Sequence, residues 1–466
     1  MTPDVISTIV KNDLCIGCGL CAAVCPERTL VMQFNHFGEY TPPRNHECVK
    51  ECGLCLEICP FADGEDNEDT IGTSLYKAIP GICHQSETGY YLNCFVGYAP
   101  ATRERGSSGG LATWFLSTLL KKGIVEYVIA VVPNEDPDQL YKYAILDDPE
   151  LVLASAGSAY YPVELSGVLQ EMQNKQGKYA IIGLPCFIKA IRLATERNRK
   201  LGERIVITVG LVCGQLKSKH YSEYISALSG VCEPLQKVHY RGKSPEKPAN
   251  NYYFSCTSKK GDTGKIFCDE GVAEAWDNRW FTPNACNYCD DVFAECADVT
   301  FMDAWLSEYS RDYKGTSLVL VRSDKIQHLI ADGIRSNEIH LKTIPVQKVI
   351  ESQSGGIKEK RINLAYRLYL NKCDGIVSPQ KRINPIKTPN PYRKKILSLT
   401  NQMQHASRTI WAEQRGKESS EMKKFRDHMN YYLTRLSRWN RVASTSEFPL
   451  NCLRSIRRNI WRYFHG

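Results

Sequence analysis

The sequence lacks a hydrophobic run long enough to cross a membrane. The longest apolar stretch of the 466 residues, at positions 205–213, is about half of the roughly 20 residues that a membrane-spanning helix needs. Residues 1–14 contain Asp4, Lys11 and Asp13 and lack the apolar core of a secretory signal. We therefore exclude a protein that spans a membrane and predict a cytoplasmic one.

The sequence also contains little that indicates nucleophilic catalysis. Its 10 histidines are scattered, and no Ser-His-Asp or Cys-His arrangement stands out, so no catalytic residue is predicted. Asp298 and Asp303 flank a predicted strand and are either groups near a site or structural carboxylates. With 43% hydrophobic and 24% charged residues, the composition excludes a mainly disordered chain.

Cysteine, by contrast, is abundant, and many of the 20 cysteines fall into short-spaced groups. The groups lie in residues 15–25, 48–59 and 286–296. In a reducing compartment such groups indicate metal or redox chemistry instead of a disulfide framework.

Two of these groups have the spacing of a bacterial-type ferredoxin with two 4Fe-4S clusters. The first is C-x2-C-x2-C-x3-C-P, and the second has one additional residue in its first gap. In this pattern three thiolates of one run bind one cluster and the fourth binds the other. Zinc, the alternative, usually takes two separated pairs of ligands and fits poorly. The predicted ligand sets are Cys15, Cys18, Cys21 and Cys59 for one cluster, and Cys48, Cys52, Cys55 and Cys25 for the other.

The residues that follow alternate between strand-like and helix-like patterns. This alternation predicts an α/β sheet with helices on its faces, in which ligands bind beyond the carboxyl ends of the strands. Strands are predicted over residues 126–132, 179–183, 205–212, 251–256, 299–302 and 317–321. Helices are predicted over residues 111–122, 163–173, 187–196, 219–228 and 324–334.

Further cysteines and a Ser-Gly segment stand near the ends of these elements. Cys286 and Cys289 form a C-x2-C pair that needs two more thiolates. Cys186 and Cys213, which each follow a predicted strand, are the natural candidates, and Cys296 is a rival. The Ser-Ser-Gly-Gly segment at residues 107–110 opens a predicted helix, where it either binds a phosphate or forms a simple cap.

These segments together resemble the beta subunits of coenzyme F420 hydrogenases and dehydrogenases. With the ferredoxin-like module, the resemblance covers about three quarters of the chain. It rests on stretches that occur in the family's order: residues 106–122 (SSGG and its helix), 154–162 (ASAGSAYYP), 181–192 (IIGLPCFIKAIR), 210–214 (GLVCG) and 286–305.

The resemblance implies a bound FAD and a third 4Fe-4S cluster. The implied cluster ligands are Cys186, Cys213, Cys286 and Cys289, and Cys296 is left out. The implied FAD contacts are Ser107, Ser108, Gly109, Gly110, Ala156, Gly157 and Ser158. Where the family commonly has Lys before Tyr, this chain has Ala159, and Met302 stands where a glycine is usual. A cation near the flavin is therefore missing, which leaves open whether a deazaflavin is the substrate.

We interpret the chain as a ferredoxin module (residues 1–64), an α/β FAD and 4Fe-4S domain (residues 65–380) and a basic helical tail (residues 381–466). The expected function is an oxidoreductase that passes electrons between the ferredoxin-type clusters, the third cluster and FAD. Hydride would be exchanged with a reduced deazaflavin or with a ferredoxin-reduced metabolite, including one of surface-polysaccharide synthesis. The alternative is a polyferredoxin-like carrier subunit without its own substrate. Ferredoxin or another electron-transfer subunit is the expected redox partner.

The tail holds much of the positive charge, with 19 basic and 5 acidic residues after position 380. Residues 381–391 are rich in proline and predict a linker, and helices are predicted over 393–408 and 420–441. Near the end, Leu453, Ile456, Ile460 and Phe464 share one helical face. Such a tail either packs on the body, lies peripherally on the inner membrane face or docks an acidic partner, with nucleic acid the least favoured.

Overall fold

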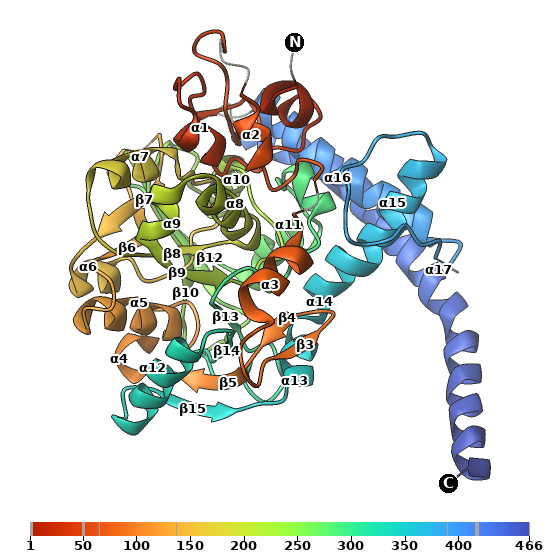
Figure 1. Cartoon of the computed structure of the whole chain (residues 1–466). Helices are drawn as coiled ribbons and strands as arrows, with labels where there is room; N and C mark the ends of the chain where they lie inside the picture. Colours follow the sequence, from red (N-terminus) through yellow and green to blue (C-terminus); the bar gives the residue numbers. More distant parts are fainter. Residues whose placement is uncertain are drawn as a thin grey trace.

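The centre of the structure, a computed structural model, is a mixed β-sheet. The structure describes residues 3–48, 52–64, 66–136, 138–388, 390–414 and 419–465, with side chains of the last range described for 421–444. The sheet has eight strands in the order β15-β5-β14-β13-β9-β8-β6-β7 (Figure 1). Strands β13, β9, β8 and β6 are parallel, and β14, β5, β15 and β7 join them through antiparallel pairings. The bounds are β5 (Asn93–Tyr98), β6 (Tyr127–Pro133), β7 (Tyr141–Leu146), β8 (Tyr179–Gly183), β9 (Ile205–Leu211), β13 (Val299–Asp303), β14 (Ser317–Val321) and β15 (His340–Thr343).

The central strands β13 and β14 are almost entirely buried. All residues of β14 are buried, as are the first four of β13, which is typical of strands covered on both faces. The sequence prediction has the same bounds for β8 and β14, and bounds within one residue for β6, β9 and β13. It missed β5 and the edge strands β7 and β15.

Helices cover both faces of this sheet. One hydrophobic core joins a face of the sheet to α5 (Leu111–Lys121), α6 (Pro149–Ala154) and α12 (Asp324–Arg335). A second core joins the other face to α7 (Ser166–Asn174), α8 (Pro185–Arg197) and α9 (Arg199–Arg204). The prediction of an α/β domain with helices on both faces of its sheet is confirmed.

A second, three-stranded antiparallel sheet lies beside the first, in the order β10-β11-β12. Its strands are β10 (Leu235–Gly242), β11 (Tyr253–Ser258) and β12 (Thr263–Phe267). An aromatic core packs it against three helices, namely α10 (Lys219–Leu228), α16 (Arg393–Gln414) and α17 (Ser419–His465). The remaining elements of this central region are α3 (Glu68–Tyr76), β3 (Cys83–Gln85), β4 (Gly89–Tyr91), α4 (Pro100–Arg103), η2 (Cys268–Glu270), α11 (Val272–Asp277) and η3 (Asn284–Tyr288).

The N-terminal module consists of short elements joined by tight turns. They are η1 (Ile6–Val10), α1 (Leu20–Val24), β1 (Gln33–Phe34), β2 (Tyr40–Thr41) and α2 (Leu54–Glu57). Gly19 and Gly53 precede α1 and α2 with φ of 80° and 72°, a left-handed conformation that favours glycine. The module packs against α7 and α8, and the amide of Leu165 donates to the carbonyl oxygen of Cys18 at 2.9 Å.

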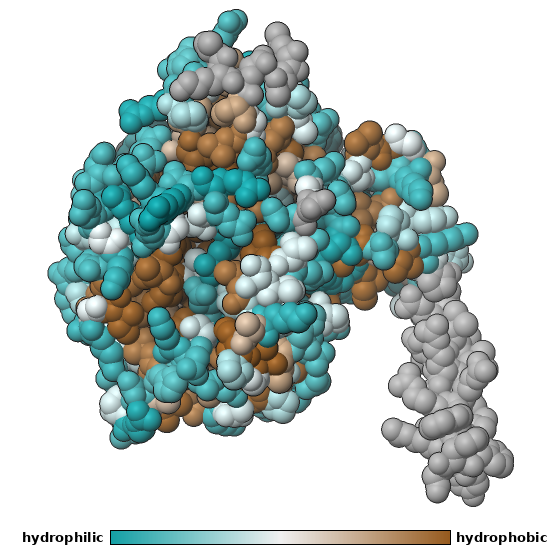
Figure 2. Space-filling model, viewed as in Figure 1, coloured by the Kyte–Doolittle hydropathy of each residue, from teal (hydrophilic) through white to brown (hydrophobic). Residues whose placement is uncertain are grey.

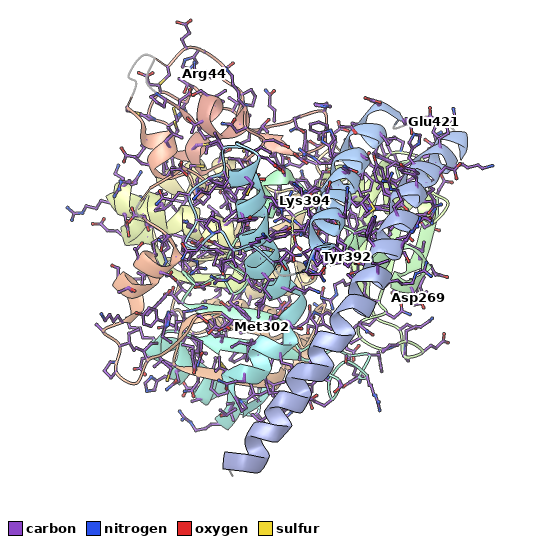
Figure 3. The ribbon with its side chains drawn as sticks, turned by 90° about the vertical axis from the view of Figure 1, so that its right-hand side faces the viewer. Arg44, Asp269, Met302, Tyr392, Lys394 and Glu421 are labelled. Atoms are coloured by element: carbon purple, nitrogen blue, oxygen red, sulfur yellow. The ribbon has the colours of Figure 1, made fainter. Side chains whose placement is uncertain are left out.

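The C-terminal region is attached to the body far more closely than a linker and a free tail would be. Its elements up to residue 373 are α13 (Val346–Ser352), α14 (Ser354–Ile357), η4 (Lys358–Asn363) and α15 (Leu364–Cys373). Residues 381–388 form no helix or strand, but Lys381 and Arg382 are buried among acidic side chains. Figure 3 shows α16 and α17 side by side, with Tyr392 and Lys394 near the beginning of α16.

The contacts of α16 explain this attachment. Arg408 forms ion pairs of 2.8 Å with both Asp13 and Glu39 of the N-terminal module. Trp411 donates to Glu223 of α10 at 3.1 Å. The described part of the tail therefore packs on the body, as one of the four sequence interpretations held. Residues Leu453, Ile456, Ile460 and Phe464 lie outside the described side chains.

Figure 2 shows a mixed surface on which hydrophobic residues gather at several places, one of them over the α15 region. Ile376, Val377 and Ile386, which follow α15 in the chain, are exposed. Within the part of the chain that the structure describes, no helix combines the length and the hydrophobicity needed to span a membrane.

Candidate functional site: three groups of cysteines and the carboxyl edge of the sheet

The first cysteine group lies in the N-terminal module and joins its two sequence runs. Burial raises the pKa of Cys15 to about 12, and the charge of Cys59 adds to this effect. Cys18 and Cys21 likewise interact electrostatically with Cys15 and Cys59. The amide of Gly17 donates to Cys15 Sγ at 3.4 Å. The structure thus brings together the four cysteines that the sequence assigns to one cluster.

The second group lies closer to the surface. Cys55 interacts electrostatically with Cys52 and Cys25. Cys25, the fourth cysteine of the first run, is therefore grouped with cysteines of the second run. Burial alone would raise the pKa of Cys25, but hydrogen bonds from Thr29 and nearby backbone amides outweigh it and lower that pKa. A lowered pKa favours the thiolate, which is the ligand form. Cys48 is half-buried and directly precedes residues outside the described range.

The third group forms at the carboxyl edge of the central sheet. Cys186 follows β8 at the start of α8, and Cys213 follows β9, while Cys286 and Cys289 lie in and after η3. Burial raises the pKa of Cys186 well above its ordinary value, and the charges of Cys289, Cys213 and Cys286 raise it further. Four cysteines from three separate parts of the chain therefore share one buried location.

N–H groups from the backbone and from a lysine donate to sulfurs of this third group. The amide of Leu216 donates to Cys286 Sγ at 3.3 Å, and Lys360 Nζ donates to Cys289 Sγ at 3.1 Å. Such bonds stabilise thiolates and cluster sulfurs. Sequence reasoning missed Lys360, because no motif surrounds it.

Cys296 lies outside this group. It is buried, and its electrostatic neighbours are Glu68, Asp291, Lys189 and Glu295, with no cysteine among the strongest of them. Its carbonyl oxygen accepts hydrogen bonds from Tyr76 and Arg192. The structure thus gives the rival cysteine a place in the packing between α3 and α8.

None of these groups has the geometry of a single-ion site. Among the described residues, no three His, Cys, Asp or Glu side chains converge as the ligands of one metal ion do. In a cubane each thiolate binds a different iron, so the four sulfurs need not converge on one point. The donor chemistry fits iron–sulfur clusters. The cysteines of these groups are buried or half-buried except Cys52, which is exposed. N–H groups donate to a sulfur in each group: Gly17 in the first, backbone amides near Cys25 in the second, and Leu216 and Lys360 in the third.

The first and third groups are neighbours. The Tyr143 side chain interacts electrostatically with Cys186 of the third group and with Cys18 of the first. One hydrophobic cluster contains Cys21, and Cys59, Cys186 and Cys289 pack against it. The two cysteine groups therefore border the same hydrophobic core.

The Ser-Gly segment, residues 107–110, lies at the same edge of the sheet, between α4 and α5. Ser108 Oγ donates to the carbonyl oxygen of Thr316 at 2.7 Å, and the Gly109 amide donates to Ser317 Oγ at 2.9 Å. A Cβ at Gly109 would lie 2.6 Å from the carbonyl oxygen of Gly97. Close packing therefore requires glycine here, whether or not the segment also contacts a ligand.

Two basic residues at the end of β10 connect the Ser-Gly segment with the turn at residues 156–158. Lys243 Nζ donates to the carbonyl oxygens of Ser108 at 2.9 Å and Lys314 at 2.6 Å. Arg241 donates to both carboxylate oxygens of Asp303, at 2.7 and 3.0 Å. Tyr160, which follows the turn, interacts electrostatically with Arg241 and Asp303. Both segments that the resemblance assigns to FAD therefore border the same basic corner.

Arg241 is a buried cation of this corner. Its side chain is 4% exposed, and among the described residues its Nε has no hydrogen-bond partner. It lies over the rings of Tyr252 and Trp305, at 4.8 and 5.3 Å from their centroids. Nothing in the sequence pointed to Arg241, because β10 was not predicted.

The two carboxylates considered from sequence have different positions. Asp298 precedes β13 and accepts hydrogen bonds from Arg192 at 2.9 Å and from the Thr208 amide at 2.7 Å. Asp303 ends β13 at the carboxyl edge, beside Arg241. Asp298 therefore holds α8 and the sheet together, whereas Asp303 borders the candidate site.

Three segments of the chain match known protein families. Residues 94–170 and 176–347 match the N-terminal and C-terminal parts of the coenzyme F420 hydrogenase/dehydrogenase beta subunit. Residues 14–62 match a 4Fe-4S dicluster domain. The chain belongs to the family of F420 hydrogenase/dehydrogenase beta subunits. The resemblance predicted from sequence is confirmed, and the family is one of iron–sulfur oxidoreductases.

Individual relatives are distant in sequence. The chain is 22% identical over 321 residues to a component of the F420H2 dehydrogenase of Methanosarcina mazei, covering 66% of this chain and 82% of the relative. It is 27% identical over 357 residues to a coenzyme F420-dependent sulfite reductase of Methanocaldococcus jannaschii, covering 72% of this chain and 49% of that protein. A chain of the F420-reducing [NiFe] hydrogenase complex of Methanosarcina barkeri is 16% identical with a TM-score of 0.48, covering 64% of this chain and 98% of that one.

Proposed function

We propose that the chain is an FAD and iron–sulfur oxidoreductase, in which three 4Fe-4S clusters connect a redox partner with a flavin at the carboxyl edge of the sheet. The observation that carries the proposal is the convergence of Cys186, Cys213, Cys286 and Cys289 next to the first ferredoxin-type group. A simple polyferredoxin does not require such a group at the edge of an α/β sheet beside a basic corner.

The proposed ligand assignment follows the three cysteine groups. Each group would hold one cluster, and the more exposed group with Cys52 and Cys55 would face the redox partner. The first group lies between that surface and the third group. Electrons would then pass from the surface through the first group to the third, or in the reverse direction.

The basic corner is the proposed flavin site. When bound, FAD exchanges two electrons as hydride with an organic molecule and single electrons with clusters. Lys243 holds the Ser-Gly segment in place through its hydrogen bonds to backbone carbonyls. Arg241 is buried beside Tyr160 and paired with Asp303, and its Nε–H, which no described residue accepts, is the donor left for an anionic group. Arg241 would thus supply a donor at a site where Ala159 replaces the lysine that is common in the family.

The organic substrate is proposed from the relatives alone. Two of them carry F420 in their names, which makes a reduced deazaflavin the first candidate. The chain spans about half the length of the sulfite reductase, so that protein's activity on sulfite is not carried over. A metabolite reduced at the expense of ferredoxin is the second candidate, favoured by Ala159 and Met302 in place of the usual family residues.

Anaerobic reconstitution tests the proposal directly. The protein is loaded with iron and sulfide in the presence of FAD, and iron, sulfide and flavin are then measured per chain. We expect about twelve irons, four per cluster, and one flavin. About twelve irons without flavin would instead support the electron-carrier alternative. Bleaching of the bound flavin by reduced deazaflavin, NAD(P)H or reduced ferredoxin then identifies the donor.

Peripheral contact of the tail with a membrane stays a prediction. A truncation at residue 380 would remove Arg382 and Arg408, which are part of the folded body. The informative comparison is therefore between the full chain and a chain ending at residue 444, in flotation with anionic liposomes. Equal flotation of the two would remove the membrane hypothesis.

A further inference from the structure

Lys360 is a buried cation that contacts a cysteine sulfur. A buried lysine usually pairs with a carboxylate instead. The residue is 2% exposed and lies in η4, beyond the last residue matched by the family at position 347. Its Nζ donates to Cys289 Sγ at 3.1 Å and to the backbone carbonyl oxygen of Asp291 at 2.6 Å. A buried ammonium group is costly unless a negative charge lies next to it.

The negative charge that would match Lys360 comes from the third cysteine group. Its Nζ contacts Cys289 Sγ directly, and its contact with Asp291 is to a neutral backbone carbonyl. Thiolates that bind a cluster are negatively charged, so the ammonium group is matched when the third cluster is present.

The neighbouring basic residues are matched differently. Arg361, the next residue, pairs with the buried carboxylate of Glu295 at 2.8 Å. Arg367 pairs with Glu359 at 2.9 Å, and Arg279 lies 3.8 Å from the same carboxylate. Lys360 is therefore the basic residue of this region whose hydrogen bonds go to a cysteine of the third group.

We propose that Lys360 raises the reduction potential of the third cluster by placing a fixed positive charge and an N–H donor against its ligand Cys289. The inference rests on the proposed cluster function. Net charge and hydrogen bonds to sulfur set cluster potentials. Reduction adds one electron to the cluster without breaking a bond, and a nearby positive charge stabilises the reduced form. Lys360 thus makes the third cluster an electron sink next to the flavin site.

The test is a redox titration of the reconstituted full-length protein, followed by EPR. The third cluster is identified as the signal that Cys289→Ser removes. Lys360→Met should lower its midpoint potential so that the one-electron equilibrium shifts about tenfold, which corresponds to about 59 mV. Lys360→Arg keeps the charge, so its midpoint potential should stay close to that of the unmodified protein. Lys358→Met, an exposed residue of the same helix, should leave the potential unchanged.

Several outcomes would overturn the inference. An unchanged potential in Lys360→Met would do so, and so would a Lys360→Arg variant that shifts as far as Lys360→Met. If Lys360→Met does not load its third cluster, Lys360→Gln keeps a donor without the charge and provides the same comparison. Failure of the proposed function is separate, because the unmodified protein would then hold about eight irons and Cys289→Ser would remove no signal.

Discussion

The pairing of the two N-terminal cysteine runs can be tested by combining substitutions. Cys15 and Cys59 are electrostatic neighbours although they belong to different runs, whereas Cys55 lies with Cys25 and Cys52. Removing two ligands of one cluster should cost that cluster alone, and removing one ligand from each cluster should cost both. With four irons per cluster, the double variant Cys15→Ala/Cys59→Ala should keep about eight of about twelve irons, and Cys15→Ala/Cys55→Ala about four.

The assay is iron and acid-labile sulfide per chain after anaerobic reconstitution, with circular dichroism to check that the variants fold. Cys296→Ala is the matched control, since Cys296 is buried but lies among acidic and basic side chains instead of in a cysteine group. It should keep all the iron. Equal iron in the two double variants would refute the assignment of ligands across runs.

Three further predictions concern the charged groups around the site. Arg382→Met should lower the free energy of unfolding by about 3 kcal/mol, because it removes a buried cation that pairs with both Glu295 and Asp290 and leaves Glu295 with Arg361 alone. In thermal denaturation Arg199→Met, which removes an exposed pair with Glu203, should cost less than about 1 kcal/mol, and equal losses would contradict the buried network. Arg241→Met should weaken FAD retention about tenfold, about 1.4 kcal/mol, without changing the iron content, and unchanged flavin affinity would place the flavin elsewhere. Burial lowers the pKa of Lys243 from 10.5 to about 8, so the contribution of Lys243 to stability is fully present above pH 10.5 and is lost as the pH falls through 8. In denaturant unfolding of the apoprotein, the stability of the unmodified chain relative to Lys243→Met should therefore increase as the pH rises from 8 to 10.5. A pH-independent difference would refute this.

The sequence by itself determined the family and most of the central sheet. The ferredoxin-type runs are recognisable because the geometry of a cubane fixes the spacing of cysteines that are close in the chain. The buried strands β8 and β14 are short apolar runs rich in Ile, Val and Leu, so local pattern alone located them with their observed bounds. The family resemblance, confirmed by the matched segments, depended on the same local motifs.

The tertiary structure decided what depends on contacts between distant residues. The placement of Cys186 and Cys213 beside Cys286 and Cys289 follows from strand order, which no local pattern encodes. In the tail, local composition predicts the wrong behaviour. The proline-rich segment has the composition of a linker, but the ion pairs of the buried Arg382 side chain fix it to the body. Isolated basic residues such as Lys360 carry no motif, and their effect depends on the charges that folding brings within a few ångströms of them.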